Sequence, residues 1–315
     1  MKLGYIGSGP ISNFHIPAIK NNGFHIAAIG SRKSSSRCEL FAKKQNLTNV
    51  FCKDGWEEVL SKDLDAYAIC IDVDATITVL EKALATRKPI FVEKPINTNP
   101  NKLIKYLNDP NIDNVFVGFN RRFYETVNIV KNICCKAKGG TIYLNMPDSE
   151  YGFKRFINNG CHMIDILRFL VGEFEIIGKT KKINTDFRDM GSFSALCKNE
   201  KWDILINAHS QIPANFSITI NTDKSVYELK PIEKLSHYHG IDILEPTKEE
   251  PIRKYVPHLK KSYIEGTKFK PGFDAMYRNF RLFADGKSSS FCDFKDAYNT
   301  LNLCWELINP FEIEL

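Results

Sequence analysis

The sequence predicts two domains: an α/β domain with a doubly wound parallel sheet over residues 1–118, then an α+β domain with a mostly antiparallel, open-faced sheet over residues 119–315. Three observations support this fold class. Short apolar runs alternate with helical patterns up to about Gly118, as in a parallel sheet covered by helices. Beyond that point, runs of alternating apolar and polar residues dominate. The length of 315 residues also suits two domains.

The first expected elements are a strand that ends at Gly7, a glycine turn, and a helix over residues 10–19. The turn reads Gly7-Ser8-Gly9-Pro10-Ile11-Ser12. Gly7 can adopt backbone angles that a side chain would forbid, and Gly9 lets the main chain approach a phosphate. The positive end of the following helix then faces that phosphate. This is the dinucleotide-binding spacing with Ser12 in the third position; a tight turn of any α/β protein is the alternative.

Further strands and helices follow in alternation up to the domain boundary. Continuous apolar runs predict buried strands at 24–31, 65–71, 89–92 and 115–117, with a short strand at 50–52. Helices are expected at 34–44, 56–60, 75–86 and 102–108; the third has its apolar residues at helical spacing.

The second domain begins with a helix at 126–136, a strand at 141–145 and a helix at 160–170. Runs such as 202–208, 216–220 and 225–229 alternate apolar and polar residues, which predicts antiparallel strands over 174–244. Helices at 273–284 and 294–308 complete the chain.

The composition is that of an ordinary globular protein, with 43% hydrophobic and 25% charged residues. The net charge of +6 is spread along the chain, so we expect no nucleic-acid partner. No apolar run approaches the roughly 18 residues of a membrane helix, and the chain starts on a strand without a signal peptide. Nine cysteines without a C-x-x-C pattern suggest buried thiols in a reducing, cytoplasmic compartment. No pattern predicts a metal site.

Two segments carry residues suited to proton transfer. Lys94, in Glu93-Lys94-Pro95, follows a buried strand at the carboxyl edge of the predicted sheet, where ligands of doubly wound sheets bind. His162 and Asp165 are three residues apart on an expected helix and therefore share a face. A solvated lysine and a structural His–Asp contact are the alternatives.

Together these motifs resemble the glucose–fructose oxidoreductase/inositol dehydrogenase family (Gfo/Idh/MocA). The family combines an N-terminal G-x-G-x-x-G with a later E-K-P and a helix that carries D-x-G-x-H-x-x-D. Here the corresponding segments are Gly7 to Ser12, Glu93 to Pro95, and Asn158-Asn-Gly-Cys-His-Met-Ile-Asp165. The resemblance is specific over residues 1–172 and rests on layout beyond them.

The resemblance implies a Rossmann-type N-terminal domain that binds NAD(P). It implies a small carbohydrate-type substrate, a sugar, sugar nucleotide or cyclitol, whose hydroxyl or ketone exchanges a hydride with the nicotinamide. Lys94 would hold and protonate the reacting oxygen, His162 would act as base or relay, and Asp165 would orient His162 or hold a substrate hydroxyl. The other implied contacts are Asp72 and Glu93 on the cofactor side, and Asn120, Arg122 and Asn158 on the substrate side.

Two departures from the family pattern concern these positions. Asn158 replaces the first carboxylate of the helix motif, and an amide cannot take a proton at neutral pH. The loop that usually reads T-P-N-x-x-H is Asp72-Val-Asp-Ala-Thr-Ile77 here. The alternatives are therefore a family member that recycles a held NAD in a glycosidase- or dehydratase-like reaction, or a non-catalytic cofactor-binding or regulatory protein.

The second strand is followed by Ser31 and Arg32, with Arg37 a turn later, and no acidic residue occurs before Glu39. NAD enzymes usually place an acidic residue there for the ribose hydroxyls, whereas a hydroxyl with arginines suits a 2′-phosphate. NADP is therefore slightly favoured over NAD. The alternative is a helix-capping serine with solvated bases.

The open-faced sheet would expose an apolar surface, for example along residues 202–208. Such a surface needs a cover. We therefore expect a homodimer or a higher homo-oligomer.

Overall fold

The computed structural model describes residues 1–53, 55–148, 155–182, 192–210 and 212–308. The chain forms two compact units. The first consists of Met1–Phe123 and Thr267–Trp305, and the second of Tyr124–Gly266 and the chain from Glu306. The first unit therefore takes in a C-terminal segment that the sequence analysis had grouped with residues 119–315.

The first unit is built on a parallel sheet with the strand order β3-β2-β1-β4-β5-β6. Strand β4 is buried along its whole length, which explains its continuous apolar run. The predicted doubly wound sheet is confirmed, and the order changes direction between β1 and β4. The strands are β1 (Lys2–Ile6), β2 (His25–Gly30), β3 (Val50–Phe51), β4 (Ala66–Ile69), β5 (Ile90–Val92) and β6 (Val115–Val117).

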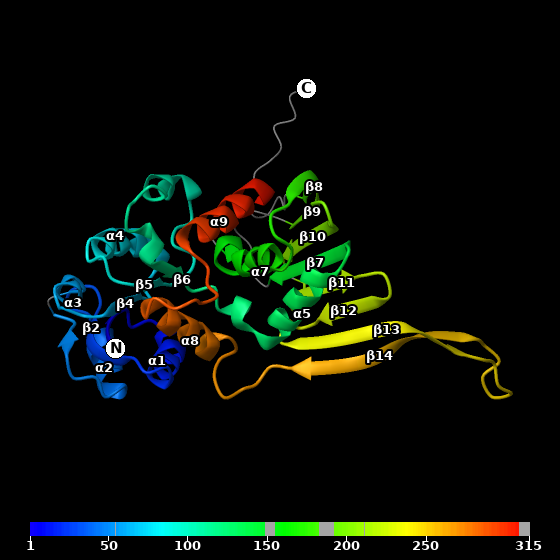
Figure 1. Cartoon of the computed structure of the whole chain (residues 1–315), viewed down its shortest axis with the longest axis horizontal. Coiled ribbons are helices and arrows are strands. Elements are labelled where there is room, and N and C mark those ends of the chain that lie inside the picture. Colours follow the sequence, from blue (N-terminus) through cyan, green and yellow to red (C-terminus); the bar gives the residue numbers. More distant parts are fainter. Residues whose placement is uncertain (54, 149–154, 183–191, 211, 309–315) are drawn as a thin grey trace, which may run out of the picture. The chain divides into compact units, whose positions relative to one another are not determined.

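Helices cover this sheet (Figure 1). From the first part of the chain come α1 (Ser12–Asn21), α2 (Ser36–Lys44), α3 (Glu57–Leu60) and α4 (Val73–Leu84). From the last part come α8 (Phe273–Ala284), which packs beside α1, and α9 (Phe294–Ile308). Phe273, Tyr277 and Phe280 of α8 are buried in one hydrophobic core with β1 and β2.

The helix predicted at 102–108 is wrong. This stretch contains two short 3₁₀ turns, η1 (Pro100–Lys102) and η2 (Ile104–Tyr106), and a third, η3 (Ile112–Asn114), precedes β6. The main chain here bonds to the carbonyl three residues back, as from the Tyr106 N–H to the Leu103 carbonyl at 3.0 Å, which closes 3₁₀ turns instead of an α-helix.

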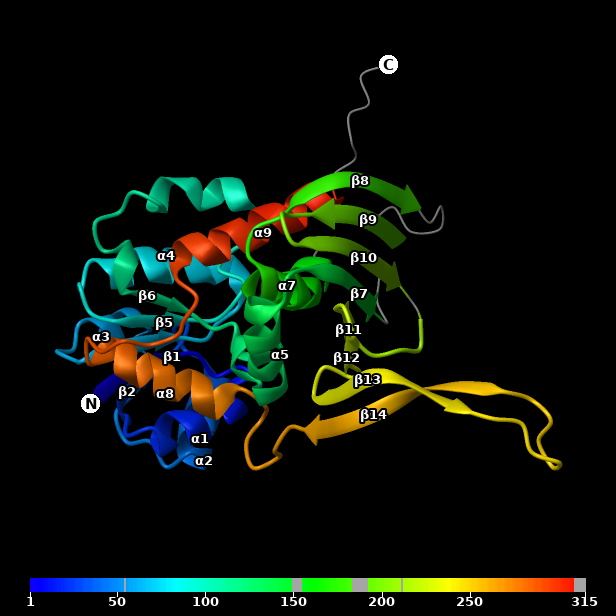
Figure 2. The same ribbon diagram turned by 45° about the vertical axis from the view of Figure 1, so that its right-hand side comes forward.

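The second unit contains an eight-stranded sheet with the order β14-β13-β12-β11-β7-β10-β9-β8. Among the described residues of this sheet only β7 and β10 pair in parallel, so the expected mostly antiparallel sheet is confirmed. Helices α5 (Glu125–Lys136) and α7 (Cys161–Val171) lie on one of its faces (Figure 2). The strands are β7 (Gly140–Asp148), β8 (Glu175–Lys182), β9 (Ser192–Lys198), β10 (Trp202–Ser210), β11 (Ser217–Asn221), β12 (Ser225–Leu229), β13 (Lys234–Leu244) and β14 (Lys254–Ile264).

Strand β14 extends the sheet beyond residue 244, where the predicted strands end. It pairs with β13 in a long hairpin (Figure 1). Nearly all side chains of β14 are exposed. Without a buried face there is no pressure for period-two alternation, so its sequence carried no strand signal.

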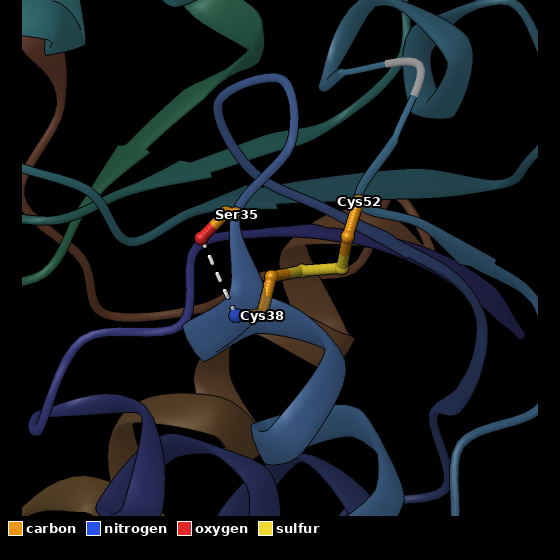
Figure 3. Close-up of a disulfide and its surroundings, with 3 residues drawn as sticks. All are labelled: Ser35, Cys38 and Cys52. Atoms are coloured by element: carbon orange, nitrogen blue, oxygen red, sulfur yellow. Dashed lines mark hydrogen bonds between the residues drawn. A yellow bond between two sulfur atoms is a disulfide. The ribbon is translucent and has the colours of Figure 1, made fainter.

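Cys38 and Cys52 form a disulfide, which corrects the expectation that the cysteines are all thiols. Their Cα atoms are 5.8 Å apart, the usual spacing for such a bond. Figure 3 shows that the bridge ties the first turn of α2 to the end of β3, and that Ser35 Oγ accepts a hydrogen bond from the Cys38 N–H. Sequence alone could not pair two cysteines among nine.

Among the residues that the structure describes, no helix is long and apolar enough to cross a membrane. The same residues contain no cluster of three His, Cys, Asp or Glu side chains that could hold a metal ion.

Candidate cofactor-binding and active site

The glycine turn lies between the end of β1 and the start of α1. Gly7 has φ +139°, and a Cβ built there would lie 2.1 Å from the Cys70 carbonyl oxygen. Only glycine therefore fits where the turn passes β4. A Cβ built on Gly9 would have nothing within 4 Å, so this residue presents bare main chain to open space. The Ser12 N–H donates to the Gly9 carbonyl at 3.0 Å, which closes the turn onto the helix.

A cavity of about 740 Å³ opens beside this turn. Its size is within the range of roughly 300–1,000 Å³ typical of small-molecule sites. The sequence-predicted residues that line it are Gly7, Ser8, Gly9, Pro10, Ile11, Ser31, Arg32, Arg37 and Asp72. The lining residues that sequence reasoning missed are Ile6, Phe14, Trp56, Cys70, Ile71, Ala75 and Val79. These lie on other elements, and no local pattern marks their side chains.

The lining fits a dinucleotide. Ser8 Oγ is buried and has no hydrogen-bond partner among the described residues, so it is available to a phosphate oxygen. The guanidinium groups of Arg32 and Arg37 supply positive charge at the β2–α2 loop. The side chains of Ile11, Trp56 and Val79 offer apolar surface that suits a flat base. Together these groups match the phosphates, the ribose and the base of a dinucleotide.

Asp72 and Ser12 have local structural roles at the edge of this region. Asp72 precedes α4, and its Oδ1 accepts a hydrogen bond from the Asp74 N–H at 3.0 Å, an N-terminal cap. Ser12 is fully buried at the start of α1 and does not line the cavity. Their cofactor contacts stay predictions.

Glu93 and Lys94 follow β5 at the carboxyl edge of the parallel sheet, and neither lines the cavity. The Lys94 N–H donates to Glu93 Oε2 at 3.1 Å, and the Lys94–Pro95 peptide bond is cis. Gly118 lies close by: a Cβ there would come within 3.2 Å of Glu93 Oε1 and 2.7 Å of the Phe91 ring. The backbone around Lys94 is thus closely packed on both sides.

Lys270 adds a second ammonium group to the same neighbourhood. Its Nζ lies 4.5 Å from the ring centroid of Phe14, which lines the cavity. Partial desolvation lowers the pKa of Lys270; the Glu93 carboxylate opposes this effect, and the cations of Arg121 and Lys94 add to it. The edge of the sheet next to Glu93 is therefore cationic.

The two expected substrate contacts after β6 make other contacts within the first unit. The Asn120 side-chain amide donates to the Pro271 carbonyl at 3.0 Å. Arg122 is buried and its Nη1 pairs with Asp296 Oδ2 at 2.6 Å. These bonds fasten the turn η4 (Asn120–Phe123) to the returning C-terminal segment. Substrate contact by either residue stays a prediction.

The second unit places Asn158, His162 and Asp165 at the start of α7. Asn158 lies in a wide turn, η5 (Phe156–Gly160), that leads into the helix. Such turns with i→i+5 bonds are frequent at functional sites. His162 and Asp165 are 7% and 0% exposed. Their spacing puts them on one face of α7, as predicted.

Comparison with known proteins agrees with this layout. Residues 1–119 match the model of the oxidoreductase family with an NAD-binding Rossmann fold, Gfo/Idh/MocA. The chain is 26% identical over 188 residues to inositol 2-dehydrogenase of Rhizobium meliloti (strain 1021), which covers 55% of this chain and 56% of that protein. It thus spans little more than half the length of this curated relative.

Solved structures resemble the chain over nearly its whole length. Levoglucosan dehydrogenase, in complex with NADH, has a TM-score of 0.77 at 15% identity, with 98% of this chain and 96% of that chain covered. UDP-N-acetylglucosamine 3-dehydrogenase from Acidithiobacillus ferrooxidans has a TM-score of 0.76 at 14% identity, with the same coverage of 98% and 96%. At such identities the likeness establishes the fold alone.

Proposed function

We propose that the chain is an NAD(P)-dependent dehydrogenase or reductase, because residues 1–119 match the model of the Gfo/Idh/MocA oxidoreductase family and the sequence motifs resemble that family. It transfers a hydride between the nicotinamide and a hydroxyl or ketone of a sugar, sugar nucleotide or cyclitol. The observation that carries this proposal is the glycine turn that opens onto the 740 Å³ cavity, with a buried serine hydroxyl and two arginines in its lining.

Each residue in the proposal has a defined task. The bound dinucleotide supplies or accepts the hydride, and Gly7, Ser8 and Gly9 hold its phosphates. Lys94 hydrogen-bonds the reacting oxygen and gives it a proton when a ketone is reduced. When an alcohol is oxidised, Lys94 takes that proton back and His162, as base or relay, accepts it from the lysine, while Asp165 orients the imidazole. The Asn158 amide can bind a hydroxyl but cannot move a proton at neutral pH.

The proposal of a carbohydrate-type substrate rests on a chemical feature shared by the compounds for which the relatives are named. The three relatives are named for inositol, levoglucosan and UDP-N-acetylglucosamine. All three compounds carry several hydroxyl groups. The Lys94 ammonium, the His162 imidazole and the Asn158 amide suit such a substrate, because each group can bind one hydroxyl.

NADP is favoured over NAD in this proposal. Ser31 and Arg32 line the cavity from the β2–α2 loop, where an NAD enzyme would usually place a carboxylate, and Arg37 lines it from the first turn of α2. A 2′-phosphate would meet two guanidinium groups and a hydroxyl there.

A turnover assay tests the proposal. Purified protein would be screened with NAD and NADP against polyols, sugars and sugar nucleotides, with absorbance of the reduced nicotinamide as the readout. Net formation or consumption of reduced cofactor is expected with at least one substrate. Product formation without that net change would favour a recycled cofactor, and tight cofactor binding without any turnover would favour a non-catalytic protein.

We also propose that the second unit mediates homodimerisation. Leu196, Leu205 and Tyr143 are cross-strand neighbours on β9, β10 and β7, and they are 43%, 37% and 38% exposed. They lie on the face of the sheet opposite the buried Ile142 and Ile204. Light scattering is expected to give at least twice the monomer mass for the native chain and the monomer mass for Leu205→Lys; a native monomer would contradict the proposal.

A further inference from the structure

A buried line of polar contacts joins three elements of the first unit beneath Lys94. The hydroxyl of Tyr277, on α8, lies 2.7 Å from His15 Nδ1, on α1. His15 Nε2 lies 3.0 Å from Glu93 Oε1. The second oxygen of that carboxylate accepts the Lys94 N–H at 3.1 Å. The line therefore ends on the main chain of the proposed catalytic lysine.

Water has little access to this line. His15 and Tyr277 are fully buried, and the Glu93 side chain is 13% exposed. The rings of Phe91 and Phe273 pack against the imidazole, with centroids 5.7 and 4.9 Å away. In such surroundings the loss of either partner would leave a buried charge unpaired and would strongly destabilise the fold. We therefore expect the His15–Glu93 pair to keep one geometry.

The groups around the imidazole of His15 favour its protonated form. Burial lowers the pKa of His15, but the opposite effect of Cys70 and the Glu93 carboxylate is larger. The net result is a pKa raised to about 10. The groups that face this cluster are Tyr5 on β1, Cys70 after β4, Glu93 after β5 and Tyr277 on α8. Burial raises the pKa of both tyrosines, which stay neutral. A protonated imidazole donates from Nδ1 to the Tyr277 hydroxyl, and its Nε2 faces the Glu93 carboxylate as an ion pair.

We propose that His15 is a positioning residue: its contacts with Tyr277 and Glu93 hold the Glu93 carboxylate, which in turn fixes the main chain of Lys94. The inference rests on the role proposed above for Lys94. His15 is only one turn into α1, the helix that begins at the phosphate-binding turn. The same side chain thus lies between the first turn of α1 and the residue that precedes Lys94.

The kinetic test compares His15→Gln with Tyr277→Phe, which removes only one hydroxyl, and with His25→Gln, an exposed histidine on β2, as the matched control. We expect kcat to fall about 10- to 100-fold in His15→Gln and less in Tyr277→Phe, as for other residues that orient a catalytic group through a second one. Cofactor Kd and substrate KM should change less than about threefold. An unchanged kcat in both variants would overturn the inference, while an inactive wild type would instead contradict the proposed function.

Stability against pH tests the ion pair independently of turnover. The folded-state pKa of about 10 lies above the ordinary value of 6.5, so the pair stabilises fully below pH 6.5 and this contribution is lost as the pH rises toward 10. The difference in unfolding midpoint between wild type and His15→Gln should therefore shrink from pH 6.5 to 10, whereas that for His25→Gln should stay constant. A constant difference for His15→Gln would overturn the inference. If that variant does not fold, Tyr277→Phe and its kcat decide.

Discussion

The glycine turn of the first unit and helix α7 of the second carry the two parts of the proposed chemistry, and they are built in different ways. At the turn, the main chain forms the proposed phosphate contacts. Gly7 fits only without a side chain, and Gly9 leaves its main chain uncovered. On α7, the useful groups are side chains, His162 and Asp165, held by burial on one helix face. A backbone site needs particular residue types at fixed spacing, whereas a side-chain site needs only a suitable group in place.

The largest effect is expected on the side-chain part. His162→Ala should lower kcat by about 10²- to 10⁴-fold, the usual contribution of a general acid or base, while the Kd of the cofactor stays unchanged. Lys94→Ala should do the same from the first unit. Steady-state kinetics and cofactor titration measure both quantities, and the exposed Lys82→Ala and His25→Ala are the matched controls. Rates like wild type in both variants would contradict the assigned roles.

The disulfide should have the next largest effect, and it should act on the stability of the first unit. Cys38 and Cys52 are 14 residues apart, so loss of the bridge should lower the free energy of unfolding by about 3 kcal/mol. Ser35, which caps α2, also donates its N–H to the Cys52 carbonyl at 3.3 Å, so the β2–α2 loop should loosen as well. Denaturant unfolding of Cys52→Ser measures this, with the buried free Cys197→Ser of the second unit as the control. If Cys52→Ser and Cys197→Ser lose the same free energy of unfolding, the loss comes from changing a buried side chain and not from breaking the disulfide.

Two glycines test whether the turn depends on backbone. Gly7→Ala should destabilise the fold by on the order of 1–3 kcal/mol, because its φ of +139° and the Cys70 carbonyl leave no room for a methyl group. Gly9→Ala should fold like wild type but bind NADPH more weakly, since its methyl group would occupy the space next to the phosphate. Thermal unfolding and NADPH titration separate these effects. Equal stabilities for the two variants would contradict the geometry.

The same contrast explains what could be predicted from the sequence. Continuous apolar runs predicted the parallel strands, and the turn was found because Gly7 is required by sterics and stands at the dinucleotide-binding spacing from Gly9 and Ser12. The strand β14 was missed because it has no buried face, and the helix at 102–108 was wrong because the main chain there closes 3₁₀ turns, which the apolar pattern does not distinguish from an α-helix. Phe14, Trp56 and Val79 were missed in the cavity, and the Cys38–Cys52 pair was missed, because both depend on long-range packing.

The smallest effect concerns cofactor choice at the β2–α2 loop, where backbone and side chains act together. Ser35 shapes the loop as the cap of α2, while Arg32 and Arg37 supply charge to the cavity. Each charge-assisted contact with a 2′-phosphate is worth about 1.5–3 kcal/mol, reduced here because solvent screens exposed arginines. Arg32→Ala should therefore weaken NADPH binding about tenfold and leave NADH binding within about twofold. Arg37→Ala should act in the same direction, and Lys43→Ala, at the far end of α2, is the control for net charge. Because screening grows with ionic strength, the NADPH preference should also decline as salt is raised. Equal losses for NADPH and NADH would mean that the arginines hold the pyrophosphate or the base, and the preference for NADP would then have no support at this loop.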